Sequence, residues 1–155
     1  MSTVSTDRPG FALPLLLLAG FQTLVDALHE ELAQRGHPDA RPLHGFALQA
    51  VGTGTTAAEL GRRLGVTKQA AAKTIASLEA AGYVERASDP ADARRILVRP
   101  TARGRDLLQR SAAIFDELRT RWAAELGEDA VRTIEDALGR VTVGPRLDAP
   151  SWFTR

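Results

Sequence analysis

A chain of 155 residues has room for one compact domain with short extensions, and 44% hydrophobic with 25% charged residues is an ordinary globular composition. The absence of cysteine excludes disulfide bonds, thiolate catalysis and cysteine-ligated zinc. Although the net charge is only +1, residues 56–100 hold eight Lys or Arg and five Asp or Glu, a local charge of +3. Such an excess suits a surface that faces phosphates, and an ordinary solvated surface would show it as well.

The N-terminal part is predicted to be a flexible arm, residues 1–10, followed by a long helix from about Phe11 to about Arg35. The first half of this helix is unusually apolar, so it needs a partner surface. The apolar run Phe11–Phe21 is shorter than the ~20 residues that a membrane-spanning helix requires. No convincing export signal accompanies it, so we expect a cytoplasmic protein without membrane association.

Three helices are predicted in the next segment. Gly36–Pro42 breaks the first helix, and Leu43–Val51 forms a short buried one. Thr56 and Glu59 have the spacing of a capping box, in which the threonine oxygen accepts from a backbone amide and the glutamate reaches back. The helix that starts there ends at Gly65, and Thr67 can cap a further helix to about Ala81. Two short helices joined by a three-residue turn predict a helix-turn-helix unit.

A hairpin and two more helices complete the predicted order. Tyr83–Arg86 and Ile96–Arg99 are expected to be strands joined by a long charged loop, residues 87–95. Pro100 cannot donate to a strand ladder and ends the second strand, after which Thr101 caps a helix to about Leu126. The last helix is predicted over Asp129–Val141. The tail, residues 142–155, contains Trp152 and Phe153, which could dock on a neighbouring surface.

The helix after Thr67 is predicted to be apolar on one face and small and polar on the other. Alanines on the outer face would permit close approach to DNA, while amides and cations could reach base edges or phosphates in the major groove. An ordinary amphipathic surface helix would have the same pattern. The candidate DNA contacts on this helix are Thr67, Lys68, Gln69, Ala72, Lys73 and Ser77.

The predicted hairpin carries two adjacent arginines, Arg94 and Arg95, near its tip. A guanidinium group on a projecting hairpin could enter the narrow, electronegative minor groove of DNA. Asp92 could hold Arg94 in position, and Arg99 could contact a phosphate. A solvated loop with a local ion pair is the ordinary alternative.

The sequence resembles the MarR family of bacterial transcription regulators. The wing pattern Asp-Pro-Ala-Asp-Ala-Arg, followed by Thr-Ala-Arg-Gly at the start of a helix, is the most specific part of the resemblance. The length and the helix order extend it over residues 11–141. The segments that carry it are Thr56–Leu64, Val66–Ala70, Leu78–Val84, Asp89–Arg94 and Thr101–Gly104.

The resemblance implies a mainly α fold with a small β-hairpin wing. Residues 43–100 would form a winged helix-turn-helix DNA-binding lobe, and residues 11–42 and 101–141 would form a helical dimerisation region. The implied function is that of a homodimeric repressor that reads a pseudo-palindromic operator in double-stranded DNA, with the fourth helix in the major groove. Arg94 falls on the family's minor-groove arginine, and Asp92 on its aspartate partner.

The resemblance also implies a site for a small-molecule effector between the lobe and the dimerisation helices. Members of the family often release DNA when a small, commonly aromatic ligand binds there. Positions that suit this lining suit plain core packing as well. The candidate lining residues are Leu17, Phe21, His44, Phe46 and Trp122.

Other classes of function have less support in the sequence. No catalytic residue or cofactor is predicted, because the three histidines belong to no hydrolase motif and no phosphate-binding glycine loop is present. A winged helix used only for protein–protein contact would leave the cations of the predicted DNA face unexplained. A zinc-responsive regulator of the same fold is a further alternative, although surface histidines explain the same residues, so no metal ligands are assigned. The residues behind that alternative are His29, Glu30, His37, Asp39 and His44.

Overall fold

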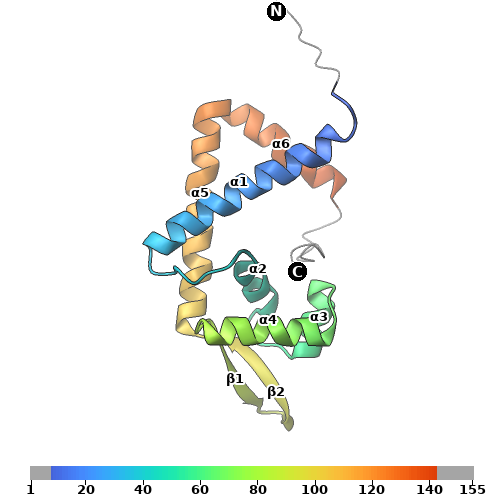
Figure 1. Cartoon of the computed structure of the whole chain (residues 1–155), viewed down its shortest axis with the longest axis vertical. Helices are drawn as coiled ribbons and strands as arrows, with labels where there is room; N and C mark the ends of the chain where they lie inside the picture. The colour runs from blue at the N-terminus through green and yellow to red at the C-terminus, as the bar shows by residue number, and fades with distance from the viewer. Residues whose placement is uncertain (1–7, 143–155) are drawn as a thin grey trace, which may run out of the picture.

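The computed structural model describes residues 8–142, and within them it contains six helices and one two-stranded antiparallel hairpin (Figure 1). The predicted order of elements and the mainly α fold class with a hairpin wing are confirmed. Most of the expected N-terminal arm and the tail from residue 143, with Trp152 and Phe153, lie outside the described residues. The elements are α1 (Ala12–Gln34), α2 (Pro42–Val51), α3 (Ala57–Leu64), α4 (Lys68–Ala80), β1 (Val84–Asp89), β2 (Asp92–Pro100), α5 (Ala102–Leu126) and α6 (Glu128–Val141).

The long helix α5 is the axis on which the other elements are arranged. In Figure 1, α2, α3, α4 and the hairpin gather at its N-terminal end, α1 crosses it, and α6 turns back from its C-terminal end. One continuous core joins the first half of α5 to the small helices and to the second half of α1. Removing these side chains from water stabilises the fold. The most deeply buried residues of this core include Leu32, Leu48, Leu60, Ile75, Leu78, Leu107 and Ile114.

Three threonines cap helices as predicted. The hydroxyl oxygens of Thr56, Thr67 and Thr101 accept from backbone amides three residues further along, at 3.1–3.2 Å. The other half of the predicted capping box is wrong, because the carboxylate of Glu59 accepts from the guanidinium of Arg62. A charge-assisted bond to arginine is stronger than a bond to a neutral amide, so the arginine takes the carboxylate.

The strands of the hairpin are longer than predicted, and the prediction of a nine-residue loop between them is wrong. β1 and β2 are joined by a turn of Pro90 and Ala91 alone, because backbone pairing continues through residues with low strand propensity. Near the tip the register is uneven: Ser88 pairs with Ile96, while Asp89 pairs with Asp92. Residues 93–95 therefore form a bulge on β2, and a bulge of this kind redirects side chains.

The base of the hairpin is fixed to the helices on both sides. Thr55, between α2 and α3, exchanges two backbone hydrogen bonds with Val98 of β2, at 2.7 and 2.9 Å. At the other side, the amide of Thr101 donates to the carbonyl of Tyr83 (3.0 Å), and the amide of Tyr83 donates to the carbonyl of Leu78 (2.9 Å). The orientation of the wing relative to α4 is therefore set by backbone hydrogen bonds.

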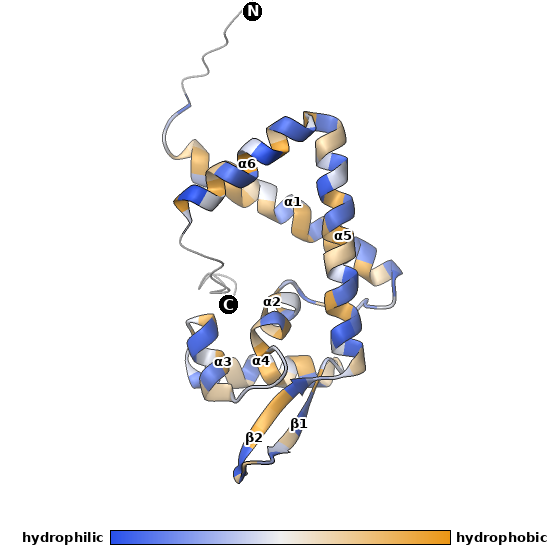
Figure 2. Cartoon of the chain, turned by 180° about the vertical axis from the view of Figure 1, so that it is seen from behind, coloured by the Kyte–Doolittle hydropathy of each residue, from blue (hydrophilic) through white to orange (hydrophobic). Residues whose placement is uncertain are grey.

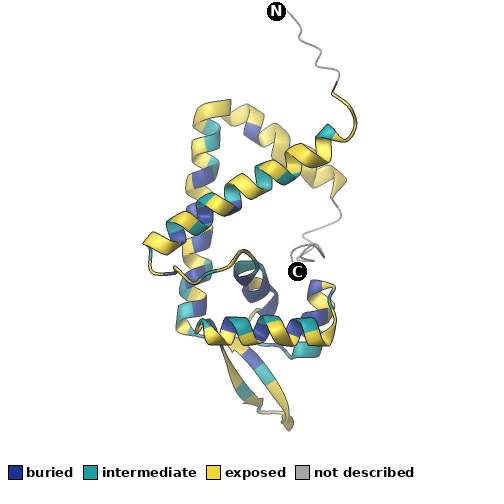
Figure 3. Ribbon diagram, viewed as in Figure 1, coloured by how far each residue is buried: buried dark blue, intermediate teal, exposed yellow. Residues whose placement is uncertain are grey.

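The first half of α1 and most of α6 do not join the core. By length and composition alone α1 could cross a membrane, but its second half is built into the core through Val25, Leu28 and Leu32. Figures 2 and 3 show that the N-terminal half of α1 is both apolar and exposed. The large hydrophobic side chains exposed on these two helices and at the start of α1 are Phe11, Leu13, Leu15, Leu16, Leu17, Ile134, Leu138 and Val141.

A substitution at Gly104 would test how closely α5 approaches the hairpin. A Cβ atom at this position would overlap the backbone carbonyl of Tyr83 and press on Leu48, so we expect Gly104→Ala to lower the free energy of unfolding by about 1–3 kcal/mol. Gly45→Ala is the matched control, because nothing lies within 4 Å of its added Cβ and alanine favours a helix by ~0.5–1 kcal/mol. Urea denaturation of both variants measures the difference. Equal stability of the two would contradict the close approach.

Candidate DNA interface and ligand cavity

The exposed face of α4 carries small and polar side chains, because the large apolar side chains of this helix are buried in the core. Ala71, Ile75 and Leu78 are buried, which fixes the rotation of the helix. Over residues 68–76, the side chains that this rotation leaves in solvent are Lys68, Gln69, Ala72, Lys73 and Ala76. The structure thus brings four of the predicted contact residues of α4 onto one open surface at the end of the molecule that carries the wing (Figure 3).

The remaining two residues predicted on this helix have internal partners. The hydroxyl of Thr67 caps α4. Ser77 is half-buried, and its hydroxyl oxygen lies 2.9 Å from Nε2 of His44 in α2. Ser77 therefore belongs to the contact between α2 and α4, and the exposed face is formed by Lys68, Gln69, Ala72 and Lys73.

At the tip of the wing, two aspartates organise the backbone. Oδ1 of Asp89 accepts from the amide of Ala91 (2.9 Å), and Oδ1 of Asp92 accepts from the amide of Arg94 (3.0 Å). These local bonds are typical of Asx turns. Asp92 thus holds the backbone of Arg94, and no ion pair in the described structure joins its carboxylate to the guanidinium group. The Arg94 side chain remains exposed and has no ion pair with any described residue.

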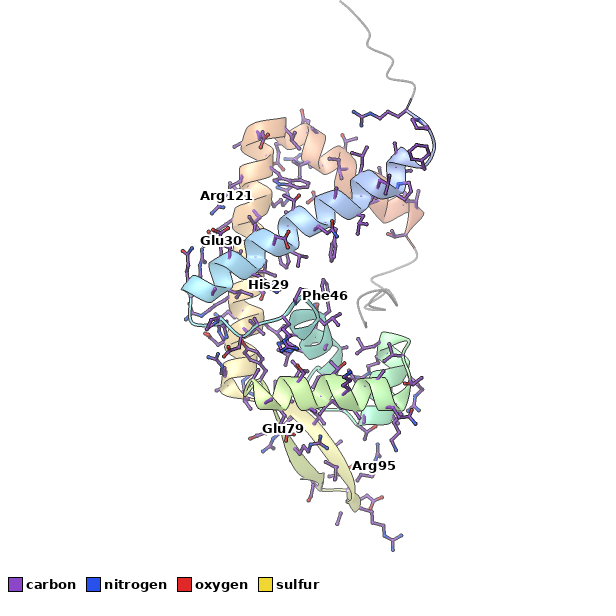
Figure 4. The ribbon with its side chains drawn as sticks, viewed as in Figure 1. His29, Glu30, Phe46, Glu79, Arg95 and Arg121 are labelled. Atoms are coloured by element: carbon purple, nitrogen blue, oxygen red, sulfur yellow. The ribbon has the colours of Figure 1, made fainter. Side chains whose placement is uncertain are left out.

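The other arginines of the wing form ion pairs. Nη1 of Arg95 lies 3.8 Å from Asp89, and Figure 4 labels Arg95 on the wing. Arg99 donates to Glu85 across the hairpin at 2.8 Å. Arg86 donates to Glu79 at 2.7 Å and ties β1 to α4. Arg94 is therefore the wing arginine with the most freedom to enter a groove.

A cavity of about 270 Å³ lies between α1, α2 and α5. Its walls are mainly apolar, with contributions from Leu28, Leu107 and Phe115, and its polar groups include His29, Arg41 and Ser111. Figure 4 shows His29 on α1 and Phe46 on α2 lying near each other at this place. A mainly apolar, partly open cavity with a few polar groups is typical of a small-molecule site.

Of the five predicted lining residues, only Phe46 lines this cavity. Phe21 stacks near Phe46 with ring centroids 6.1 Å apart, Trp122 packs against α1 at Gly20, and Leu17 is exposed. His44 is buried but faces α4. The predicted residues of α1 therefore lie outside this cavity, and the face of α1 that lines it carries Val25, Leu28, His29 and Leu32 at helical spacing.

Comparison with known proteins agrees with this geometry. Residues 46–95, from α2 to the wing, match a sequence model described as the MarR family. The resemblance to the MarR family is confirmed. Members of this family are transcription regulators and not enzymes. A search of curated proteins found no match to the sequence.

Solved MarR structures share the fold over most of the chain. The reduced form of MarR from Escherichia coli has 25% identity and a TM-score of 0.70 over 88% of this chain and 98% of its own. A MarR family protein from Mycobacterium tuberculosis, in complex with salicylic acid, has 28% identity and a TM-score of 0.60 over 90% and 100%. An E. coli MarR mutant in complex with operator DNA has 24% identity and a TM-score of 0.66 over 85% and 94%.

Two histidines of the chain are buried, and both ring nitrogens of each have a hydrogen-bond partner. The ring of His37 bonds the Tyr83 hydroxyl through Nδ1 (3.1 Å) and Asp106 through Nε2 (2.7 Å). His44 accepts from the Arg41 amide at Nδ1 (3.2 Å), so its Nε2 donates to Ser77. Within residues 8–142, no group of three His, Asp or Glu could hold a metal ion. The structure does not bring the residues behind the zinc alternative together.

Burial lowers the pKa of His44 to about 4, and the nearby positive charge of Arg41 adds to this effect. Burial also lowers the pKa of His29, against an opposing effect of Asp26. Protonation of His44 would remove the acceptor at Nδ1. The ring is therefore neutral in the folded protein near neutral pH.

This shift predicts a pH dependence of stability. The unfolded chain binds a proton at His44 from about pH 6.5 downward, whereas the folded protein binds it only near pH 4, so stability is lost as the pH falls between these values. At neutral pH the neutral state of His44 contributes about 3 kcal/mol to the free energy of unfolding. Urea denaturation from pH 7.5 to 4.5 should show a steeper loss for the wild type than for His44→Gln. Parallel curves would contradict a neutral, buried His44.

Proposed function

We propose that this chain is a homodimeric transcriptional repressor in the cytoplasm that binds a pseudo-palindromic operator in double-stranded DNA. In this proposal, α4 enters the major groove and the wing arginine Arg94 enters the minor groove. The half-sites would lie about one helical turn apart, since two-fold-related recognition helices enter successive major grooves roughly 34 Å apart. The E. coli relative solved with operator DNA supports this reading by analogy.

The observation that carries the proposal is that α4 and the wing tip expose cations without ion pairs in the described structure. Lys68, Lys73 and Arg94 have no ion pair with any described residue, although most arginines around them form one. Both lysines lie on the exposed face of α4, and Arg94 lies at the tip of the adjoining wing. An internal ion pair would have to be broken before its cation could serve a phosphate, so unpaired cations bind DNA at lower cost.

Dimerisation is supported by the apolar surface on α1 and α6. A monomer in water rarely exposes so many large hydrophobic side chains on adjoining elements. Phe11, Leu13 and Val141 are more than 60% exposed. A second copy of the chain related by a two-fold axis would cover this surface and would place two copies of α4 for a palindromic site.

Control by a small, largely apolar effector is supported by the cavity between α1, α2 and α5. The M. tuberculosis relative was solved with salicylic acid. Here the wall of the cavity includes Arg41 and Phe46, which flank His44, and His44 contacts α4 through Ser77. A ligand that moves the start of α2 would therefore also move a contact of the recognition helix.

The DNA proposal predicts the effect of changes at the wing tip and on α4. Arg94→Ala should weaken operator binding on the order of tenfold or more without changing thermal stability, because an exposed tip contributes little to the core. Arg94→Lys should also bind less tightly, since an ammonium group is more strongly hydrated than a guanidinium group. Gln69→Ala should weaken operator binding more than nonspecific binding, by ~1–3 kcal/mol of discrimination.

Selection from random duplex DNA would supply the operator, and fluorescence anisotropy on operator and scrambled duplexes would measure these effects. The selected site should be a palindrome. An Arg94→Ala protein that binds like the wild type at every salt concentration would remove the wing from the mechanism. Unchanged operator preference in Gln69→Ala would mean that α4 does not read bases.

The dimer proposal predicts that Leu16→Asp is monomeric, because a charge in an apolar interface must be buried without a partner. Leu16 is half exposed in the protomer, so the fold should persist. Ile96→Asp is the matched control: Ile96 is similarly exposed but lies on the wing. Analytical ultracentrifugation should give twice the chain mass for the wild type and Ile96→Asp. A dimeric Leu16→Asp would contradict an interface through α1.

A further inference from the structure

The two lysines of this chain occupy one helix. Of 20 basic residues, 18 are arginine, and the two lysines are Lys68 and Lys73. Both belong to α4, and both side chains are exposed. The whole basic surface outside the recognition helix therefore consists of arginine, and the lysine amines are confined to the face that the proposed function directs at DNA.

The structure gives neither lysine a role in stability. Lys68 opens α4, where the helix dipole disfavours a positive charge and where the first turn has no acidic residue to offset it. Lys73 lies among exposed alanines at positions 72 and 76. Neither amine has an ion pair with a described residue, so both are accessible to a reagent from solvent.

Lysine and arginine differ in one chemical property that matters here. The lysine amine can be acylated, which removes its charge, whereas the guanidinium group stays protonated and keeps its charge. We propose that Lys68 and Lys73 are acylation sites, and that an acyl phosphate neutralises them and releases the protein from DNA. This inference rests on the proposed DNA-binding function of α4.

The reaction needs no group beyond the lysine and the acyl donor. The unprotonated Nζ attacks the acyl carbon, a C–N bond forms, and the bond from this carbon to the phosphate oxygen breaks. Phosphate leaves with the electron pair, and the nitrogen loses a proton to water. Each event replaces an ammonium ion with a neutral amide, so the recognition helix loses one positive charge per lysine.

Acetyl phosphate is the probe for the experiment. Full-length protein is incubated with it, acetylated positions are identified by peptide mass spectrometry, and the Kd for the selected operator is compared before and after treatment for each protein. Wild type should acquire acetyl groups on Lys68 and Lys73, and its Kd should rise on the order of tenfold or more. The slope of log K against log salt should become shallower by about one per acetylated lysine that contacts a phosphate.

Two variants separate this effect from other modifications. In K68R/K73R the Kd after treatment should equal the Kd before it, because α4 then carries no lysine whose charge acetylation could remove. Adding R121K to that variant places one acylatable lysine on α5, away from α4 (Figure 4). This third protein should be acetylated at position 121 without any change in Kd.

The outcomes distinguish failure of the proposed function from failure of this inference. Untreated protein that binds no DNA overturns the proposed function and this inference together. Untreated protein that binds an operator, but whose lysines stay unmodified or whose Kd stays unchanged after acetylation, overturns this inference alone. An equal loss of affinity in K68R/K73R also overturns it, because the modification would then act elsewhere.

Discussion

The contact between Gly104 of α5 and the carbonyl of Tyr83 is the constraint on which the arrangement of this molecule depends. At this point α4 has ended, the hairpin begins, and the chain returns from β2 into α5. No side chain separates the helix from the hairpin backbone here, and there is no room for a Cβ atom between them. The proposed DNA-reading elements and the axis of the molecule therefore share one rigid junction.

Side chains from two directions complete this junction around Tyr83. Its ring is fully buried, its hydroxyl bonds His37 from the α1–α2 connection, and Arg103 of α5 lies 5.2 Å above the ring centre. His37 continues to Asp106, whose pKa is lowered by its hydrogen bonds to Arg110 and to this histidine. Hydrogen bonds that satisfy the buried His37 and Tyr83 favour one arrangement of the helices around them.

The same neighbourhood gives a physical route from the cavity to the recognition helix. Arg41 lines the cavity and donates its backbone amide to His44, and His44 donates to Ser77 of α4. Because burial keeps this histidine neutral, the direction of both hydrogen bonds is set. The proposed effector control requires that the two ends of this chain of contacts move together, and the hydrogen bonds supply that connection.

The sequence determined the helices and the face of α4 that is exposed. Threonine caps at residues 56, 67 and 101, left-handed Gly65 and Gly82, and the apolar spacing of α4 are local features, so each can be read from a few neighbouring residues. The motifs of the helix-turn-helix and of the wing are local in the same sense. This is why the fold and the candidate DNA surface could be predicted without coordinates.

Only the tertiary structure decided which polar groups are available and where the cavity lies. Ser77 has the right position for a groove contact, but His44, 33 residues away, takes its hydroxyl. Arg99 and Arg95 have acidic partners that only the pairing of β1 with β2 brings close, while Arg94 has none in the described structure. The cavity depends on where α1 crosses α5, and Leu17, Phe21 and Trp122 fall outside it. Helical periodicity gives the face of one helix, whereas a crossing point and a pairing register depend on residues distant in sequence, so no local pattern could supply them.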